Sequence, residues 1–298
     1  MSISGRVTEE QKNYLIVDTS EGLVRSTIKG TLKKEKTRVY TGDFVDLEII
    51  NREPLTGIIT RVHERSSLLR RPAVANLSQV FFIFTLKAPP LDLKSLDRFL
   101  FSAQVYKLKA HIVFNKIDLL ESDEQQQLES FSSIYRKIGY TILWTSAVTG
   151  EGLTELVEHC KNHVSAFSGL SGAGKSSLLS KIIPEKSFRT ADVSGSTGRG
   201  THTTTNVSLF PLKEGGYVAD TPGLSFVNIP TVPEEEVISY FPELECRIGQ
   251  CRYNDCIHGG EPGCVVDKLI EQNEIAGFRK EHYLEIYREM KEIRKRYR

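Results

Sequence analysis

The sequence has little that would mark a membrane, secreted or strongly charged protein. Its 298 residues contain no run of about 18 apolar residues, so no membrane-spanning helix is expected. The N-terminal MSISGRVTEE has no apolar core behind a charged head, and we therefore expect no secretory leader and a cytoplasmic protein. The formal net charge is only +1, which excludes a uniformly basic or acidic chain. No repeat of fixed period occurs, which argues against a solenoid.

Cysteine is scarce and unevenly placed. Four of the five cysteines fall between Cys246 and Cys264. In a reducing compartment such a cluster favours a metal site over disulfides. The length of 298 residues is enough for two or three domains, each with its own core.

The chain divides into three segments that differ in hydrophobic pattern and composition. Residues 1–70 carry short β-rich runs between turn residues and predict a small antiparallel barrel of the oligonucleotide-binding (OB) type; the runs are Tyr14–Val17, Leu23–Ile28, Phe44–Ile50 and Gly57–Val62. Residues 71–227 alternate buried strands with amphipathic helices, which predicts a doubly wound α/β fold with a parallel sheet. Residues 228–298 read as a helical module around the cysteine-rich loop.

A basic stretch lies between two of the barrel runs. Residues 29–38, KGTLKKEKTR, contain five positive charges and one negative. Clustered Lys and Arg in a barrel loop attract the phosphates of a nucleic acid, so RNA binding is one interpretation. The other is an ordinary solvated hairpin tip.

The strongest motif in the chain is a glycine-rich phosphate loop. It runs from Gly169 to Ser176, GLSGAGKS, and leads directly into an apolar helical start. Glycines let backbone N–H groups surround phosphate oxygens at a helix N-terminus, whereas the alternative is an unrelated Gly/Ser loop. Lys175 is expected at the β- and γ-phosphates, and Ser176 on Mg²⁺. The nucleotide-binding residues predicted here are Gly169, Leu170, Ser171, Gly172, Ala173, Gly174, Lys175, Ser176 and Ser177.

A candidate base-reading element precedes the phosphate loop. Asn115-Lys116-Ile117-Asp118 closes a hydrophobic strand, and its Asp can accept both the ring N–H and the exocyclic amine of guanine. The alternative is a plain strand end followed by a helix cap. One strand later, Thr145-Ser146-Ala147 is placed to offer a backbone N–H to the guanine carbonyl.

Two further elements follow the phosphate loop. Asp220-Thr-Pro-Gly223 comes after a strand-like segment, as expected of a carboxylate that holds Mg²⁺ through water and a glycine N–H that meets the γ-phosphate. Residues 195–206, GSTGRGTHTTTN, lie between the phosphate loop and Asp220. Their hydroxyls suit a switch loop that completes Mg²⁺ coordination. The alternative for this stretch is a polar connector.

All five elements of a guanine-nucleotide site are present, in the order base, base, phosphate, switch, switch. A parallel sheet whose ends lie close together can be cut and rejoined without changing its core, so we predict a circularly permuted GTPase domain. Together with the N-terminal barrel and the C-terminal cysteine module, this order resembles the RsgA/YjeQ family over essentially the whole chain. The resemblance implies a GTPase that is stimulated by the small ribosomal subunit and acts late in its maturation. It also implies that the barrel and the metal module grip the subunit and its rRNA; we expect a monomer.

The residues that carry hydrolysis are less defined. Leu224 stands where many GTPases have a glutamine that orients water. His202 resembles the family's switch-loop histidine and is one candidate for positioning the attacking water. The alternative is that a ribosomal group or a potassium ion positions it. The catalytic candidates are Lys175, His202, Thr203, Thr204, Asp220 and Gly223.

The cysteine module has ligands suited to zinc. Three thiolates and one imidazole fit tetrahedral Zn²⁺, which can fold a segment too short for its own core. The resemblance selects Cys251, Cys256, His258 and Cys264, although Cys246 competes with Cys251. The alternative is a set of reduced thiols without metal. The final helix, from Phe278, carries eight Lys/Arg and four Asp/Glu and either contacts rRNA or is an ordinary charged helix.

Two other function classes compete with a GTP hydrolase. An RNA-binding assembly factor that uses nucleotide mainly as a conformational switch, with little turnover, would need a site unable to hydrolyse, and the intact Lys175, Ser176 and Asp220 argue against it. A metabolic P-loop kinase would prefer ATP and lack the Asn115–Asp118 element.

Overall fold

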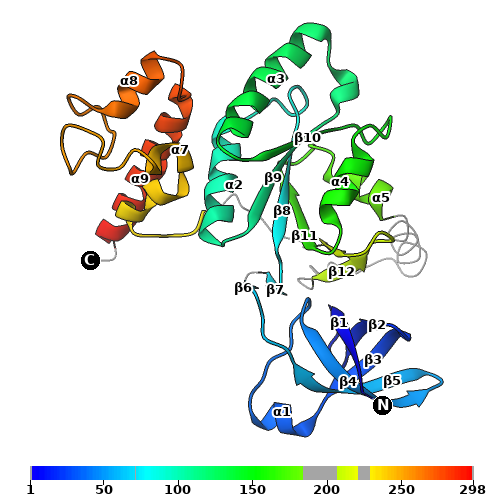
Figure 1. Ribbon diagram of the computed structural model, residues 1–298. Helices are drawn as coiled ribbons and strands as arrows, with labels where there is room; N and C mark the ends of the chain where they lie inside the picture. The colour runs from blue at the N-terminus through cyan, green and yellow to red at the C-terminus, as the bar shows by residue number, and fades with distance from the viewer. Residues whose placement is uncertain (1, 71, 184–206, 221–228, 297–298) are drawn as a thin grey trace.

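The computed structural model describes residues 2–70, 72–183, 207–220 and 229–296. Figure 1 shows an N-terminal barrel in blue, a central α/β layer structure in cyan and green, and a C-terminal helical module in orange and red. The barrel, the sheet and the helical module predicted from the sequence are all present.

The N-terminal segment forms a closed barrel. Its strands are β1 (Ser2–Glu10), β2 (Leu15–Thr19), β3 (Gly22–Ile28), β4 (Phe44–Arg52) and β5 (Leu55–Val62), with the short helix α1 (Gly30–Lys34) between β3 and β4. The strand order β1-β2-β3-β5-β4 closes because β4 also pairs with β1. Alternate strand positions turn inward and bury an apolar cluster that includes Val7, Val17, Val24, Leu47 and Ile59.

Three barrel features differ from the sequence expectation. β3 and β5 pair in parallel, so the barrel is not antiparallel throughout. No run was predicted over β1, because its SISGRVTEE is polar at both ends and its pairing with β2 shifts register between Val7 and Glu9. The basic stretch is not an open hairpin tip, because five of its residues form α1. Lys33 and Lys34 occupy the last turn of that helix, where cations complement the helix dipole.

The central domain is built on a parallel sheet. Its strands are β8 (Gln79–Phe84), β9 (Lys109–Asn115), β10 (Thr141–Thr145), β11 (Val164–Gly169), β12 (Ser208–Pro211) and β13 (Tyr217–Asp220), in the order β10-β9-β8-β11-β13-β12. Only β12 runs antiparallel to its neighbour. The helices are α2 (Leu93–Val105), η1 (Ile117–Leu119), α3 (Ser122–Lys137), α4 (Leu153–Cys160) and α5 (Lys175–Ile182). Because β8, β9, β10 and β11 are parallel, the loops at their carboxyl ends share one edge of the sheet.

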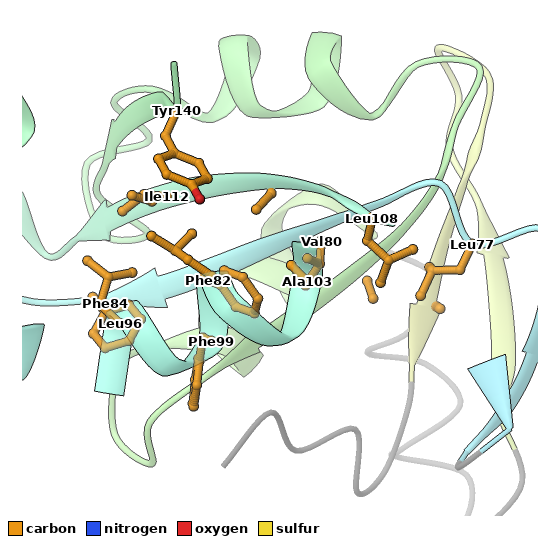
Figure 2. Packing of buried hydrophobic residues seen from close by; sticks show 14 of the residues in the cluster. Leu77, Val80, Phe82, Phe84, Leu96, Phe99, Ala103, Leu108, Ile112 and Tyr140 are labelled. Atoms are coloured by element: carbon orange, nitrogen blue, oxygen red, sulfur yellow. The ribbon is translucent and has the colours of Figure 1, made fainter. Parts of the chain in front are cut away.

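Both faces of this sheet are covered. All six residues of β8 are buried, and its side chains alternate between two cores. Phe82 and Phe84 face α2 and pack with Leu96 and Phe99 (Figure 2). Phe81 and Ile83 face the side covered by α4 and α5. The buried run QVFFIF therefore forms the centre of the domain.

The barrel is attached to the sheet through β12 and β13. Along the chain, a hairpin of β6 (Leu68–Arg70) and β7 (Ala73–Ala75) leads from the barrel to the central domain. The hydroxyl of Thr41 donates to the carbonyl of Val207, at 3.3 Å, and β12 also pairs with β1. The Tyr217 hydroxyl donates to Oδ2 of Asp18, at 2.9 Å. The strand that ends in Asp220 is thus tied to the barrel at its first residue.

The C-terminal module packs on α2. Its elements are η2 (Glu234–Tyr240), α7 (Pro242–Glu245), α8 (Val265–Glu271) and α9 (Gly277–Arg296). Phe101 of α2 enters the module's core beside Phe241 and Tyr283. Figure 1 shows the module on the α2 side of the central domain. Among described residues, no helix has the length and apolarity needed to cross a membrane.

A buried ion-pair network joins the module to the central domain. Arg279 of α9 is 1% exposed and donates to Oδ1 of Asp97 at 2.5 Å and to Oε1 of Glu243 at 2.6 Å. Tyr135 and His282 also contact the Asp97 carboxylate, at 2.7 and 2.6 Å. Burial opposes the charge of Arg279, but the two carboxylates outweigh it and raise the pKa of the guanidinium. The first half of α9 is therefore a packing helix.

We expect Asp97→Asn to lower the free energy of unfolding by about 3 kcal/mol, because it leaves the buried Arg279 with a weaker partner. Urea unfolding followed by circular dichroism measures the change. The matched control is Glu129→Gln, which breaks the exposed Arg136–Glu129 pair and should cost less than about 1 kcal/mol. Equal losses in the two variants would contradict a stabilising role of the network.

Candidate functional site

The glycine-rich loop connects β11 to α5 at the carboxyl edge of the sheet. Gly169 ends β11, and Gly174 precedes the first residue of α5 with φ +91°. A Cβ on Gly174 would lie 2.3 Å from Nδ2 of Asn115, and one on Gly169 would lie 2.2 Å from the carbonyl oxygen of Ile83. Both positions combine an unusual backbone with close contact, so only glycine fits them.

Lys175 and Ser176 begin α5. The Lys175 ammonium donates to the carbonyls of Gly169 and Leu170, at 2.7 and 2.8 Å, and thus lies over the loop. Burial lowers the pKa of this amine. Ser176 and Ser177 are exposed on the first turn, while Ala173 is fully buried. The loop places a cation and two hydroxyls beside the N-terminus of a helix, an arrangement suited to phosphate.

Asn115 connects three loops. Its side chain is buried at the end of β9, and Nδ2 donates to the carbonyl of Ala173 in the glycine-rich loop, at 2.9 Å. The Thr145 hydroxyl, at the end of β10, donates to Oδ1 of Asn115 at 3.2 Å. The predicted base-reading segments and the phosphate loop therefore form a single site.

Asp118 and Ser146 face each other across two loops. Asp118 is exposed in η1, and the Ser146 hydroxyl donates to its Oδ1 at 2.5 Å. The same hydroxyl accepts from the backbone N–H groups of Val148 and Thr149, at 3.2 and 3.1 Å. Ser146 thus fixes the carboxylate while one oxygen stays available. The sequence placed Ser146 and Ala147 here for a backbone N–H and gave no sign of the hydroxyl contact.

Lys116 occupies a left-handed backbone position, φ 64°, between Asn115 and η1. Its ammonium donates to the carbonyl of Ala88, at 2.7 Å, in the loop after β8. Ile117 is buried and anchors the turn. The contact with Ala88 involves a loop that carries no motif, so sequence reasoning did not single it out.

Several predicted catalytic residues are beyond the described residues. His202, Thr203, Thr204 and Gly223 fall in residues 184–206 and 221–228, outside the described ranges. The backbone of Asp220 ends β13 and pairs with Ser208 of β12, whereas its side chain is not among the described ones. Their roles stay predictions.

The four predicted metal ligands come together in the C-terminal module. The ligand atoms of Cys251, Cys256, His258 and Cys264 all lie within 4.8 Å of one another. Nδ1 of His258 is 3.4 Å from Sγ of Cys251, 3.6 Å from Sγ of Cys256 and 3.4 Å from Sγ of Cys264. Tetrahedral zinc with ordinary Zn–N and Zn–S bonds requires N···S edges of about 3.5 Å. The donor set therefore fits zinc in both chemistry and size.

Backbone N–H groups approach the sulfur atoms of two of the ligands. The backbone N–H groups of Val265 and His258 point at Sγ of Cys251 and Cys256, at 3.3 and 3.4 Å. Cys246 is exposed and lies outside the cluster, with its thiol directed at the carbonyl of Glu243. The alternative in which Cys246 replaces Cys251 is therefore not the arrangement seen.

Glu261 is a neighbour of the cluster that sequence reasoning missed. Its carboxylate accepts from the backbone N–H groups of Ile257 and Gly259, at 3.2 and 2.7 Å, and lies 3.3 Å from Sγ of Cys256. It closes the loop that carries two of the ligands. An acidic residue between glycines in the ligand loop was the available signal.

Comparisons with a family model and with known sequences agree with one another. The family model described as RsgA GTPase matches residues 62–230. The chain is 43% identical to the small ribosomal subunit biogenesis GTPase RsgA of Moorella thermoacetica over 95% of both proteins. It is 35% identical to the protein of the same name from Caldanaerobacter subterraneus subsp. tengcongensis, over 99% of this chain and 98% of that protein.

Two solved structures are similar to this chain over nearly its whole length. The crystal structure of YjeQ from Thermotoga maritima matches with a TM-score of 0.80 and 34% identity, covering 97% of this chain and 99% of the other. The structure of YloQ, described as a circularly permuted GTPase, matches with a TM-score of 0.80 and 28% identity, covering 98% and 96%.

We expect Gly174→Ala to weaken guanine-nucleotide binding by about a hundredfold, because the added methyl group meets the Asn115 amide and strains the left-handed backbone. Titration with a fluorescent GDP analogue measures the affinity. The matched control is Gly139→Ala, which has a similar φ of +95° and nothing within 4 Å of the new Cβ. A Gly174→Ala protein with wild-type affinity would show that the loop tolerates separation from Asn115.

Proposed function

The chain belongs to the RsgA GTPase family, and from that membership we propose that it hydrolyses GTP on the small ribosomal subunit during late maturation. The family makes it a circularly permuted GTP hydrolase that uses guanine nucleotide and Mg²⁺. Stimulation of hydrolysis by the subunit, contact with rRNA, a monomeric state and action in the cytoplasm are parts of the proposal. The names of its relatives, small ribosomal subunit biogenesis GTPases, support the choice of partner.

The base end of the nucleotide is assigned to Asp118 and Lys116. The free oxygen positions of the Asp118 carboxylate accept the ring N–H and the exocyclic amine of guanine, a donor pair that adenine lacks. The Lys116 stem covers the purine face while its ammonium stays on Ala88. Ser146 holds the carboxylate in place, and the backbone N–H of Ala147 faces the guanine carbonyl in this proposal.

The phosphate end is assigned to the glycine-rich loop. Backbone N–H groups between Gly169 and Ser176 surround the β-phosphate, and Lys175 exchanges its loop carbonyls for the β- and γ-phosphate oxygens. Ser176 and Asp220 would hold Mg²⁺, which neutralises charge that develops on the phosphates. The attacking water needs a further group, and we assign it to His202 or to a group supplied on the ribosome.

The observation that carries this proposal is the Asn115 bridge. The amide contacts Ala173 and Thr145, which supports a single site for the base end and the phosphate end, although the two lie far apart in the chain.

Zinc would be held by Cys251, Cys256, His258 and Cys264. The ion would cross-link a loop in which the four ligands span fourteen positions, and it would keep the loop packed against Tyr283, whose hydroxyl donates to the carbonyl of Ile257 at 3.0 Å. In this role the metal is structural and stays away from the nucleotide.

We expect GTP to bind at least about a hundredfold more tightly than ATP, because adenine lacks the two donors that Asp118 accepts. We also expect purified small subunits to raise the rate of phosphate release from GTP. Titrations with fluorescent GTP and ATP analogues, followed by phosphate-release assays with and without subunits, measure both. Lys175→Ala is the control and should be inactive under every condition.

Two results would overturn the proposal. Equal affinity for ATP would remove the base assignment, and a hydrolysis rate indifferent to small subunits would remove the ribosomal partner. GTP binding with subunit association but no turnover would favour an assembly factor in which nucleotide acts only as a switch.

We expect the purified protein to contain one zinc ion per chain, and Cys264→Ser to lose it together with several degrees of melting temperature. Elemental analysis and thermal unfolding measure the two effects. Cys246→Ser is the matched control, since its exposed thiol lies outside the cluster and the variant should keep both the zinc and the stability. Loss of zinc from the control instead would move the ligand set to Cys246.

A further inference from the structure

The loop between β8 and α2, residues 85–92, forms a wall of the nucleotide site that no motif marks. It lies at the same sheet edge as the glycine-rich loop, because β8 and β11 are parallel neighbours. A Cβ built on Gly172 would be 3.7 Å from Cδ of Pro89. On its other side the loop receives the Lys116 ammonium at the carbonyl of Ala88. The loop therefore contacts the base segment and borders the phosphate segment.

The position of Lys116 depends on that carbonyl. Lys116 is half-exposed, and a lysine with a free ammonium samples many rotamers, at an entropic cost when it is ordered over a ligand. The 2.7 Å bond to Ala88 removes much of this freedom before the ligand arrives. This reduction of the entropic cost of binding exists only while the Ala88 carbonyl points toward Lys116.

The shape of the loop is held from inside by Thr85. This residue is 2% exposed, and its hydroxyl donates to the carbonyl of Pro89, at 2.6 Å, four residues ahead. The backbone N–H of Leu91 donates to the carbonyl of Leu86, at 3.0 Å, and closes the same turn. The Thr85 bond thus fixes the peptide next to the Ala88 carbonyl.

The loop is also held from outside by Lys87. Its ammonium lies 2.7 Å from the Glu124 carboxylate at the start of α3 and donates to the carbonyl of Leu119, at 3.2 Å. The hydrogen bond to Glu124 raises the pKa of Lys87, which stays charged. These contacts are exposed and therefore weak, so the buried Thr85 bond is the main internal constraint.

We propose that Thr85 is a positioning residue for nucleotide binding: through Pro89 and Ala88 it places Lys116 over the purine. The inference rests on the proposed function, because it takes the Asn115–Asp118 segment as the base site. Thr85 itself does not touch nucleotide. Because the contact concerns the base and not the γ-phosphate, its loss should weaken binding and leave turnover at saturation intact.

A double-mutant cycle tests this inference on the full-length protein. Thr85→Val keeps the shape of the side chain and removes its hydroxyl, and we expect about tenfold weaker binding of a fluorescent GDP analogue with kcat for GTP unchanged. Thr85→Ser keeps the hydroxyl and should restore affinity. In a Lys116→Ala background, Thr85→Val should have no further effect, because the residue through which it acts is gone.

Two further variants separate positioning from folding. Ser102→Ala removes another buried hydroxyl, which bonds the carbonyl of Arg98 at 2.9 Å within α2, and it should leave affinity unchanged. If Thr85→Val unfolds the protein, Pro89→Gly loosens the same loop at a partly exposed position. It should give the same loss, again only when Lys116 is present.

The outcomes distinguish the inference from the function on which it rests. An unchanged affinity in Lys116→Ala would remove the base-site assignment itself. A loss in Lys116→Ala with none in Thr85→Val and Pro89→Gly would overturn the positioning role alone. Losses that add fully in the double variants would show that Thr85 acts on binding without Lys116, and would also overturn it.

Discussion

One buried amide holds the nucleotide site together. Asn115 bonds the carbonyl of Ala173 and receives the hydroxyl of Thr145, so three loops from distant parts of the chain meet at one side chain. Gly174 approaches so closely that a single methyl group would push the phosphate loop away from this amide. The separation of the predicted base-reading and phosphate-binding elements is thus set by the contact of the Asn115 side chain with the backbone of the phosphate loop. Permutation leaves that contact intact because it changes only the order in which the same strands are connected.

The same permutation explains where the flanking parts attach. The barrel holds the β12–β13 pair, through Thr41 on Val207 and Asp18 on Tyr217, and β13 ends at Asp220. The C-terminal module is attached elsewhere on the central domain, to α2, through the ion pair of Arg279 with Asp97. One flanking part therefore contacts the strands that border the predicted switch segments, and the other contacts the helix behind the base-end loop. Binding of a large partner to both would act on the site from two sides.

The sequence was informative where local pattern and structure coincide. The buried run of β8, the glycine-rich loop and the Asn115–Asp118 segment were predicted because strand periodicity and motif spacing are local properties. The sequence was uninformative where a contact joins residues that belong to no motif. Nothing in the sequence marks Thr85 or Ala88, since a threonine and an alanine before two prolines look like an ordinary loop. The choice between Cys246 and Cys251 was likewise open, because both spacings suit zinc and only the fold brings Cys251 to His258. β1 was missed because it is polar at both ends and a register shift between Val7 and Glu9 interrupts its alternation.

The helix α2 connects the loop that supports Lys116 with the C-terminal module. Its N-cap, Asp92, closes the loop that supports Lys116, and Asp97 lies five residues further on, in the buried network with Arg279. An apolar contact tolerates sliding by a fraction of a turn, whereas a buried guanidinium loses its partners when it moves, at a cost of several kcal/mol, roughly. The C-terminal module is therefore docked on α2 in a narrowly defined position. Arg279 thereby fixes α2 relative to the C-terminal module, whereas the peptide next to the Ala88 carbonyl is held separately by Thr85 at the end of β8.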